Sequence, residues 1–284
     1  MAVLKQIPFE GPLARRLAQP RPEDVSLFWL GQAGFVIDAR GRRIVVDPYL
    51  SGSLALKYRD SAYSHVRMAS APVTADELGA VDLVLCTHHH TDHMDGETLK
   101  RLAMRLPRLN FVVPAASGPL ARQRIGVSGD RLIEVDAGES VNLTGFRLQV
   151  MRAAHETLER DEQGRHRFLG YGLDFGTVRI FHSGDTIPFE GQDDEIAAFA
   201  PNLALLPVNG RSEALKSAGF PGNLTLSEAM ALCQRCDVPV MIAHHYGMFA
   251  FNTLAPEVID AAAARAPDTL VQARQGMEFR LDGA

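Results

Sequence analysis

A short stretch of the sequence, LCTHHHTDHMDG at residues 85–96, concentrates side chains that bind metal ions. It holds four histidines and two aspartates, and the spacing H-x-H-x-D-H is formed by His88, His90, Asp92 and His93. Imidazole nitrogens and carboxylate oxygens are the ligands that zinc, manganese and iron ions prefer. Burying so many polar rings without an ion would leave many donors and acceptors to satisfy. The stretch therefore predicts a metal site rather than an exposed polar turn.

The elements that must hold this loop can be read on both sides of it. The apolar run VDLVLCTH predicts a buried strand that ends at the cluster. Apolar runs bounded by turn residues predict strands at 26–38, 42–50, 81–88, 109–114, 131–136, 139–154, 168–176, 177–185, 202–210, 238–245, 269–273 and 276–281. Helical spacing predicts helices at 96–106, 117–126, 225–236 and 255–266. Strands that cluster and then alternate with helices in both halves predict an α/β fold, a four-layer α/β/β/α sandwich.

The sequence also indicates how the chain is organised. Residues 1–25 are rich in Pro, Arg and Gln and are expected to form an N-terminal arm, and residues 26–284 a single domain. Residues 48–77 form the widest stretch without clear periodicity. Long loops inside compact domains are often functional lids, so we expect this one to serve the site.

Composition limits the classes of partner. The formal net charge is −5 and no run of basic residues stands out, which argues against nucleic acid as a partner. The sequence shows no signal-peptide pattern and no apolar run of membrane-spanning length. Three sparse cysteines fit buried thiols in a reducing compartment, so a cytoplasmic protein is expected. The sequence does not reveal the oligomeric state, and a homo-oligomer is one of the states compatible with it.

The histidine loop resembles the signature of the metallo-β-lactamase fold hydrolases, and further motifs follow in that family's order. WLGQAGFVI and IVVDPYL resemble the opening strands, AAHET supplies a histidine, FHSGDT a strand-end aspartate, and IAHHYGMF the last histidine motif. These motifs lie between residues 26 and 253. The resemblance implies the sandwich fold of that family and a metal-dependent hydrolase.

The resemblance also implies a site for two divalent transition-metal ions, zinc or manganese, with iron possible. One ion would be held by His88, His90 and His155, and the second by Asp92, His93 and His245, with Asp185 between them. A hydroxide shared by two cations is nucleophilic near neutral pH. Asp185 or Asp92 would shuttle the proton to the leaving group. The adjacent His244 and His245 cannot point the same way from a strand, and the family pattern favours His245 as the ligand.

Within the family, the chain is most similar to the L-ascorbate-6-phosphate lactonase group. Three parts of the chain carry that likeness: WLGQAGFVI with RIVVDPYLS, LLPVNGR with GFPGNLTLSEAMAL, and HHYGMFAFNT. It implies a small anionic ester or lactone, such as a sugar lactone phosphate, as the substrate. Arg211 could fork onto a phosphate or carboxylate. The residues expected to bind substrate are Asn209, Arg211, Arg59 and Tyr246.

Two other classes of function remain open at this point. Endings similar to YGMF occur in phosphodiesterases that act on N-acyl phosphatidylethanolamine, so a metal-dependent phosphodiesterase or nuclease is the alternative. A non-enzymatic protein or an oxygen-reducing di-iron protein could use the same ligands. The arginines and lysines of residues 48–77 have an alternative interpretation: each can be an ordinary charged residue of a solvent-exposed loop rather than a part of the site.

Overall fold

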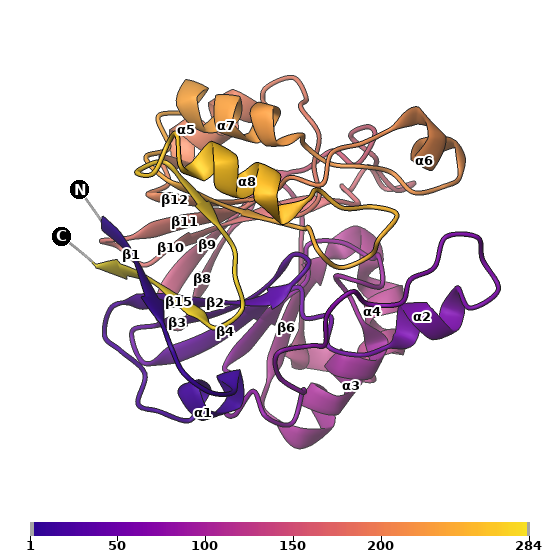
Figure 1. The fold of residues 1–284 in the computed structure, drawn as a ribbon. Coiled ribbons are helices and arrows are strands. Elements are labelled where there is room, and N and C mark those ends of the chain that lie inside the picture. The colour runs from indigo at the N-terminus through magenta and orange to yellow at the C-terminus, as the bar shows by residue number, and fades with distance from the viewer. Residues whose placement is uncertain (1–2, 283–284) are drawn as a thin grey trace. The chain divides into compact units, whose positions relative to one another are not determined.

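The computed structural model describes residues 3–282, and its contacts divide the chain into two compact units. Unit 1 comprises Met1–Val135, Met248–Phe251 and Arg274–Ala284. Unit 2 comprises Asp136–Gly247 and Asn252–Ala273. Each unit is built around one β-sheet with helices against it (Figure 1).

The sheet of unit 1 contains strands from both ends of the chain. Its order is β1-β15-β2-β3-β4-β5-β6-β7, and the pairing is antiparallel from β1 to β4 and parallel from β4 to β7. The strands are β1 (Val3–Pro8), β2 (Val25–Gly31), β3 (Gly34–Ala39), β4 (Arg42–Val46), β5 (Leu83–Leu85), β6 (Asn110–Pro114), β7 (Leu132–Val135) and β15 (Met277–Asp282). The carboxyl ends of β4, β5 and β6 share one edge, where ligands usually bind in such sheets. The histidine loop leaves β5 at this edge.

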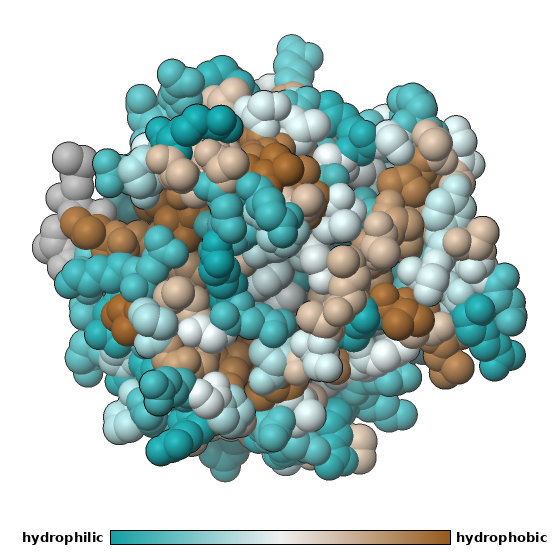
Figure 2. Space-filling view, viewed as in Figure 1, coloured by the Kyte–Doolittle hydropathy of each residue, from teal (hydrophilic) through white to brown (hydrophobic). Residues whose placement is uncertain are grey.

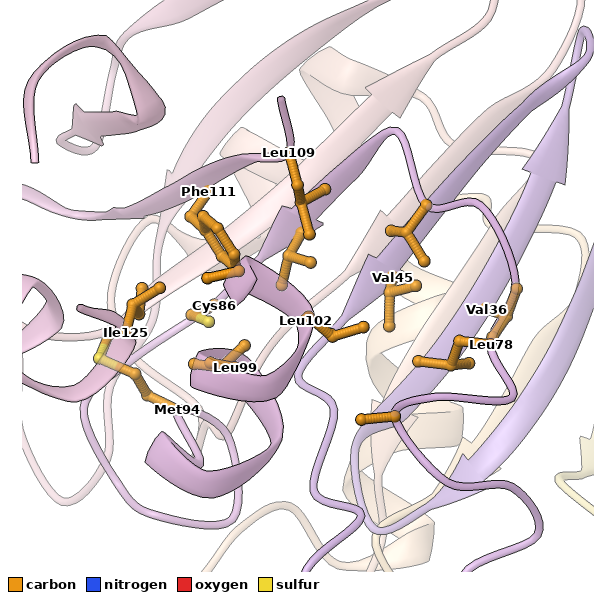
Figure 3. Close-up of a cluster of buried hydrophobic side chains, with 14 of the residues drawn as sticks. Val36, Val45, Leu78, Cys86, Met94, Leu99, Leu102, Leu109, Phe111 and Ile125 are labelled. Atoms are coloured by element: carbon orange, nitrogen blue, oxygen red, sulfur yellow. The ribbon is translucent and has the colours of Figure 1, made fainter. Parts of the chain in front are cut away.

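The helices of unit 1 bury apolar side chains, and all but the second do so in one cluster with residues of this sheet. They are α1 (Leu13–Leu17), α2 (Ser53–Lys57), α3 (Gly96–Arg105) and α4 (Gly118–Ile125), with 3-10 turns at Ala115–Ser117 and Gly129–Arg131. Leu99 and Leu102 of α3 lie in a buried cluster with Cys86 and Phe111 (Figure 3). Asp95 caps α3 by accepting a hydrogen bond from the backbone N–H of Thr98. The helix is thereby fixed directly after the histidine loop.

Residues of the expected arm are part of unit 1. β1 pairs with β15 along its whole length, and Leu13 and Leu17 of α1 are buried in the same cluster as the sheet residues. A buried ion pair lies nearby: the guanidinium of Arg43 makes two 2.7 Å bonds to the carboxylate of Asp38 and also donates to the carbonyl of Leu17. Removing one member of such a pair strongly destabilises the folded protein, because the charge of the other member stays buried without a partner.

The sheet of unit 2 has the order β14-β13-β12-β11-β10-β9-β8. Its strands are β8 (Ser140–Leu143), β9 (Phe146–Arg152), β10 (Leu169–Asp174), β11 (Arg179–His182), β12 (Leu203–Pro207), β13 (Met241–His244) and β14 (Leu270–Gln272). The helices of this unit are α5 (Gln192–Phe199), α6 (Glu213–Ser217), α7 (Leu226–Arg235) and α8 (Pro256–Ala263). Strands β11 to β14 run parallel, so the loops after β11, β12 and β13 leave one edge of this sheet. Within residues 3–282, no helix has both the length and the apolar character that a membrane crossing needs.

Candidate metal centre

The turn that follows β5 gathers four potential ligands within unit 1. The ring centroid of His88 lies 4.7 Å from that of His90 and 3.9 Å from that of His93. The Oδ2 atom of Asp92 is 3.7 Å from Nε2 of His93. His88 and His93 are fully buried, and His90 and Asp92 are half-buried. A buried group of three imidazoles and a carboxylate is a donor set that suits a divalent transition-metal ion.

Asp47, at the end of β4, organises this loop from behind. Its carboxylate accepts hydrogen bonds from the backbone N–H of Thr87 at 2.8 Å, from the Thr87 hydroxyl at 2.6 Å and from Nδ1 of His93 at 2.7 Å. The Thr87 hydroxyl donates to Asp47 and so accepts the Nδ1 proton of His88, 3.0 Å away. Both rings therefore carry the proton on Nδ1 and the lone pair on Nε2. Metal-binding histidines are held in this way by outer hydrogen bonds.

Gln32, another residue of unit 1, also supports the turn. Gln32 donates from Nε2 to Oδ2 of Asp92 at 2.8 Å. Both Gln32 and Asp47 adopt left-handed backbone conformations, with φ of 51° and 44°, which residues other than glycine adopt rarely. Such strained backbone conformations cluster at functional sites. Neither residue was among the predicted site residues. The position of Asp47 at the end of a predicted strand was the one feature of the sequence that could have indicated its role.

The unit 2 ligand candidates form a second group. His155 follows β9, and Asp185 follows β11 in the turn SGD. The carboxylate oxygens of Asp185 lie 3.7 Å from Nε2 of His155 and 3.1 Å from Nε2 of His245. Nδ1 of His155 donates to the carbonyl of Gly222 at 3.1 Å, which places the lone pair on Nε2. One buried carboxylate thus lies between two imidazoles.

The adjacent histidines of the last motif point in different directions. His244 is the last residue of β13, and His245 adopts a left-handed φ of 62°. The ring of His244 stacks on that of His182 at 5.2 Å, whereas His245 lies beside Asp185. Burial, helped by the neighbouring His182 and His245, holds the pKa of His244 well below its usual value. The geometry agrees with the preference for His245, and its role as a ligand stays a prediction.

The residues expected to bind substrate all have partners within the protein. Arg211 makes two 2.6 Å bonds to the carboxylate of Glu228, and Arg59 pairs with Asp60 on the surface. The other two are also engaged: Asn209 bonds to Asn252 and Asn223, and the buried Tyr246 donates to the carbonyl of Ala273. Arg211 is therefore engaged by a carboxylate in this structure. Substrate binding by these four residues stays a prediction.

The Arg211–Glu228 pair gives a prediction for stability. The Arg211 guanidinium, followed by bonds from Thr225, lowers the pKa of Glu228 from 4.5 to about 2. Because the folded pKa is the lower one, the pair stabilises the protein above pH 4.5, and this stabilisation is lost as the pH falls from 4.5 toward 2. Glu228→Gln removes the charge of the pair but keeps an amide oxygen that can accept from the backbone N–H of Thr225 in the capping box of α7. We expect a loss of about 1 kcal/mol in the free energy of unfolding at pH 7, since solvent screens the partly exposed pair.

Urea unfolding at pH 7 and at pH 2.5 measures this effect. The difference between Glu228→Gln and the native protein should shrink at the lower pH, because Glu228 is protonated in the unfolded chain and partly protonated in the folded protein there. The matched control is Glu213→Gln, an exposed glutamate at the start of α6. An equal loss at both pH values would show that the ion pair does not stabilise the fold.

The aperiodic stretch at residues 48–77 packs as an aromatic cluster within unit 1. The rings of Tyr58 and His65 stack at 4.1 Å, and His65 lies 4.9 Å from Phe249 and 4.8 Å from Phe251. Burial lowers the pKa of His65, so the ring is neutral at pH 7. Apolar side chains of the same stretch remain exposed, among them Leu56, Val66 and Met68. Figure 2 shows hydrophobic residues on the side of the molecule where α2 lies. The stretch presents aromatic and apolar side chains beside exposed charged residues such as Lys57, Arg59 and Asp60.

Comparison with known proteins extends these observations. Residues 42–246 match the family model of the beta-lactamase superfamily domain. A "UPF0173 metal-dependent hydrolase" of Metallosphaera sedula is 30% identical over 183 residues, which cover 64% of this chain and 71% of that protein.

Solved structures support the fold. The isothiocyanate hydrolase from Delia radicum gut bacteria has a TM-score of 0.73 and 18% identity, covering 91% of this chain and all of that one. The metallo-beta-lactamase fold protein YhfI from Bacillus subtilis has a TM-score of 0.62 and 12% identity, covering 90% and 99%. The predicted α/β fold class is confirmed, with two sheets of the metallo-β-lactamase type. This chain belongs to the beta-lactamase superfamily and to its metal-dependent hydrolases.

Proposed function

We propose that the protein hydrolyses a small anionic ester or lactone, such as a sugar lactone phosphate, with two divalent transition-metal ions, zinc or manganese. The observation that carries the proposal is the set of hydrogen bonds to the Nδ1 atoms of His88, His93 and His155. Each bond holds an imidazole with its Nε2 lone pair available as a ligand.

The proposed ligand sets follow the family pattern. One ion would be held by His88, His90 and His155, and the other by Asp92, His93 and His245, with Asp185 serving both. Divalent cations held there would lower the pKa of a nearby water molecule and so supply the nucleophile. The charges fit this role, because neutral imidazoles and two carboxylates partly balance two cations.

The side chains of the protein then orient and move protons. Asp47 and Thr87 hold the rings of His88 and His93 in position. Gln32 orients the carboxylate of Asp92. Asp92 and Asp185 are the proposed proton carriers, taking the proton of the attacking water and delivering it to the departing alkoxide.

The substrate class rests on the sequence likeness to the lactonase group and on the aromatic cluster of Tyr58, His65, Phe249 and Phe251 in unit 1. Flat aromatic faces with nearby polar groups are typical linings of small-molecule sites. Arg211 would bind the anionic group of the substrate after its guanidinium has released the carboxylate of Glu228. A phosphodiesterase uses the same ligands, and the experiment below separates the two activities.

The test combines metal content with a substrate screen. Purified protein is analysed for bound metal by mass spectrometry, stripped with a chelator, and reloaded with zinc or manganese. Each sample is assayed with sugar lactones and with bis(p-nitrophenyl) phosphate. We expect about two ions per chain and lactone hydrolysis that appears only in loaded samples. Turnover of the phosphodiester alone would replace the lactonase assignment, and a protein that binds no metal under any supply would refute the metal centre.

A further inference from the structure

A cavity of about 530 Å³ lies within unit 2, lined by residues of helix α5 and of the strands β9 and β11. A volume of this size accommodates a drug-sized molecule. No proposed metal ligand lines it. The lining combines apolar and basic side chains, chiefly Met151, Phe199, Arg147, Arg152 and Arg179.

The cavity follows from the sequence of β10. Two alternate residues of this strand, Gly170 and Gly172, lack side chains and share one face of the sheet. The Phe199 ring of α5 lies over Gly172, so close that a Cβ atom there would be 2.7 Å from the ring. The aromatic ring occupies the place of a strand side chain. The hollow beside it, over β9, is left open.

The charge of the lining is opposite in sign to that of the whole chain. Three arginines line the cavity, against one carboxylate, Glu195, whereas the chain has a net charge of −5. Glu195 is paired with Arg152. A further carboxylate, Asp174, pairs in register with Arg147 and Arg179 on the neighbouring strands and bonds to Arg147 at 3.3 Å. The positive charges outnumber the negative ones even when Asp174 is counted.

Arg179 differs from the other two arginines. Within residues 3–282, its guanidinium has no carboxylate in salt-bridge range, and it lies 6.0 Å from the centroid of the Phe199 ring. A guanidinium that faces a cavity beside an aromatic ring offers a planar fork for a carboxylate, sulfonate or phosphate. The apolar floor next to it can bury a hydrocarbon or aromatic group.

We propose that this cavity is a binding site for a small amphipathic anion, with its apolar body on Met151 and Phe199 and its anionic group on Arg179. The proposal does not depend on the metal centre or on the reaction. It is tested by binding alone, so its failure is distinguishable from a failure of the proposed function.

The experiment uses naphthalene-2-sulfonate as the probe and isothermal titration calorimetry on the whole chain. One molecule should bind per chain, and naphthalene-2-carboxamide, which lacks the charge, should bind about tenfold more weakly. Arg179→Gln should weaken binding of the sulfonate by about tenfold, since it removes a charged hydrogen bond. The control variant Arg265→Gln makes the same charge change on the surface of unit 2 and should bind like the native protein.

A second variant keeps the test decisive if Arg179→Gln is unstable. Ala198 is an exposed residue of α5 that lines the cavity, and Ala198→Trp should fill the opening and abolish binding without disturbing the core. Thermal unfolding of each variant checks that it is folded. Absence of binding at millimolar probe, or equal binding by the native protein and Ala198→Trp, would overturn the proposal.

Discussion

Replacing Asp185 by asparagine is expected to reduce metal-dependent hydrolysis by about a thousandfold or more and to lower the bound metal content. The carboxylate of Asp185 is 3.7 Å from Nε2 of His155 and 3.1 Å from Nε2 of His245, so both of its oxygens face candidate ligands. Asparagine has nearly the same shape but offers one oxygen and no charge. The ions would lose a shared anionic ligand, and the reaction would lose a proton carrier.

Metal analysis and steady-state rates of the native protein, Asp185→Asn and Asp193→Asn measure this effect. Asp193 is an exposed aspartate of the same unit that pairs with Arg235, so its substitution makes the same chemical change away from the ligands. The control should retain metal and rate. If Asp185→Asn kept both its ions and its rate, Asp185 would have no place in the centre. Circular dichroism of each variant excludes a loss of fold.

Local patterns in the sequence were sufficient to locate the long helices. The predicted helix at 96–106 is α3, which starts after the cap Asp95 and ends at Arg105, before Pro107. The predicted helix at 117–126 is α4, which ends at Gly126 in a left-handed conformation. Caps, glycines and prolines act within one or two turns of the chain, and the sequence displays them directly.

Contacts between distant segments were not visible in the sequence. Residues 3–8 carry polar and proline residues typical of an arm, but they form β1 because β15, at the other end of the chain, offers an edge with which to pair. The burial of the pair formed by Arg43 and Asp38 was also missed, because Leu17 and Leu78, whose carbonyls accept from the Arg43 guanidinium, lie 26 and 35 residues away in the chain. Charged residues at strand positions indicate exposure unless the partner that buries them is known.

The candidate site likewise has one part that could be predicted from the sequence and one part that could not. Its potential ligands were named from motifs, since His88, His90, Asp92 and His93 occupy a fixed spacing in one loop. The residues that orient those ligands were missed because they come from elsewhere: Asp47 is 46 residues away from His93 in the chain. Hydrogen bonds of this kind depend on the parallel pairing of β4 with β5, which places Asp47 beside the loop.

Asp47 therefore provides the second strong prediction. Asp47→Ala should weaken metal binding by about 10-fold to 100-fold, the usual effect of removing an outer partner of a metal-binding histidine. The buried N–H groups of Thr87 and His93 would lose a charged acceptor, which should lower the free energy of unfolding of the metal-free protein by about 2–4 kcal/mol. Asp47→Asn keeps an oxygen for Thr87 but loses the charge, so its affinity should lie between those of Asp47→Ala and the native protein.

Chelator competition on the folded variants measures metal affinity, and urea unfolding of the stripped proteins measures stability. Asp76→Ala, which removes a surface ion pair with Arg101 in the same unit, is the control and should change neither quantity by more than about 1 kcal/mol. A variant that lost stability but bound metal as tightly as the native protein would make Asp47 a purely structural residue. Weaker binding in Asp47→Asn, which retains most of the fold, is expected only if Asp47 positions His88 and His93 for the ions.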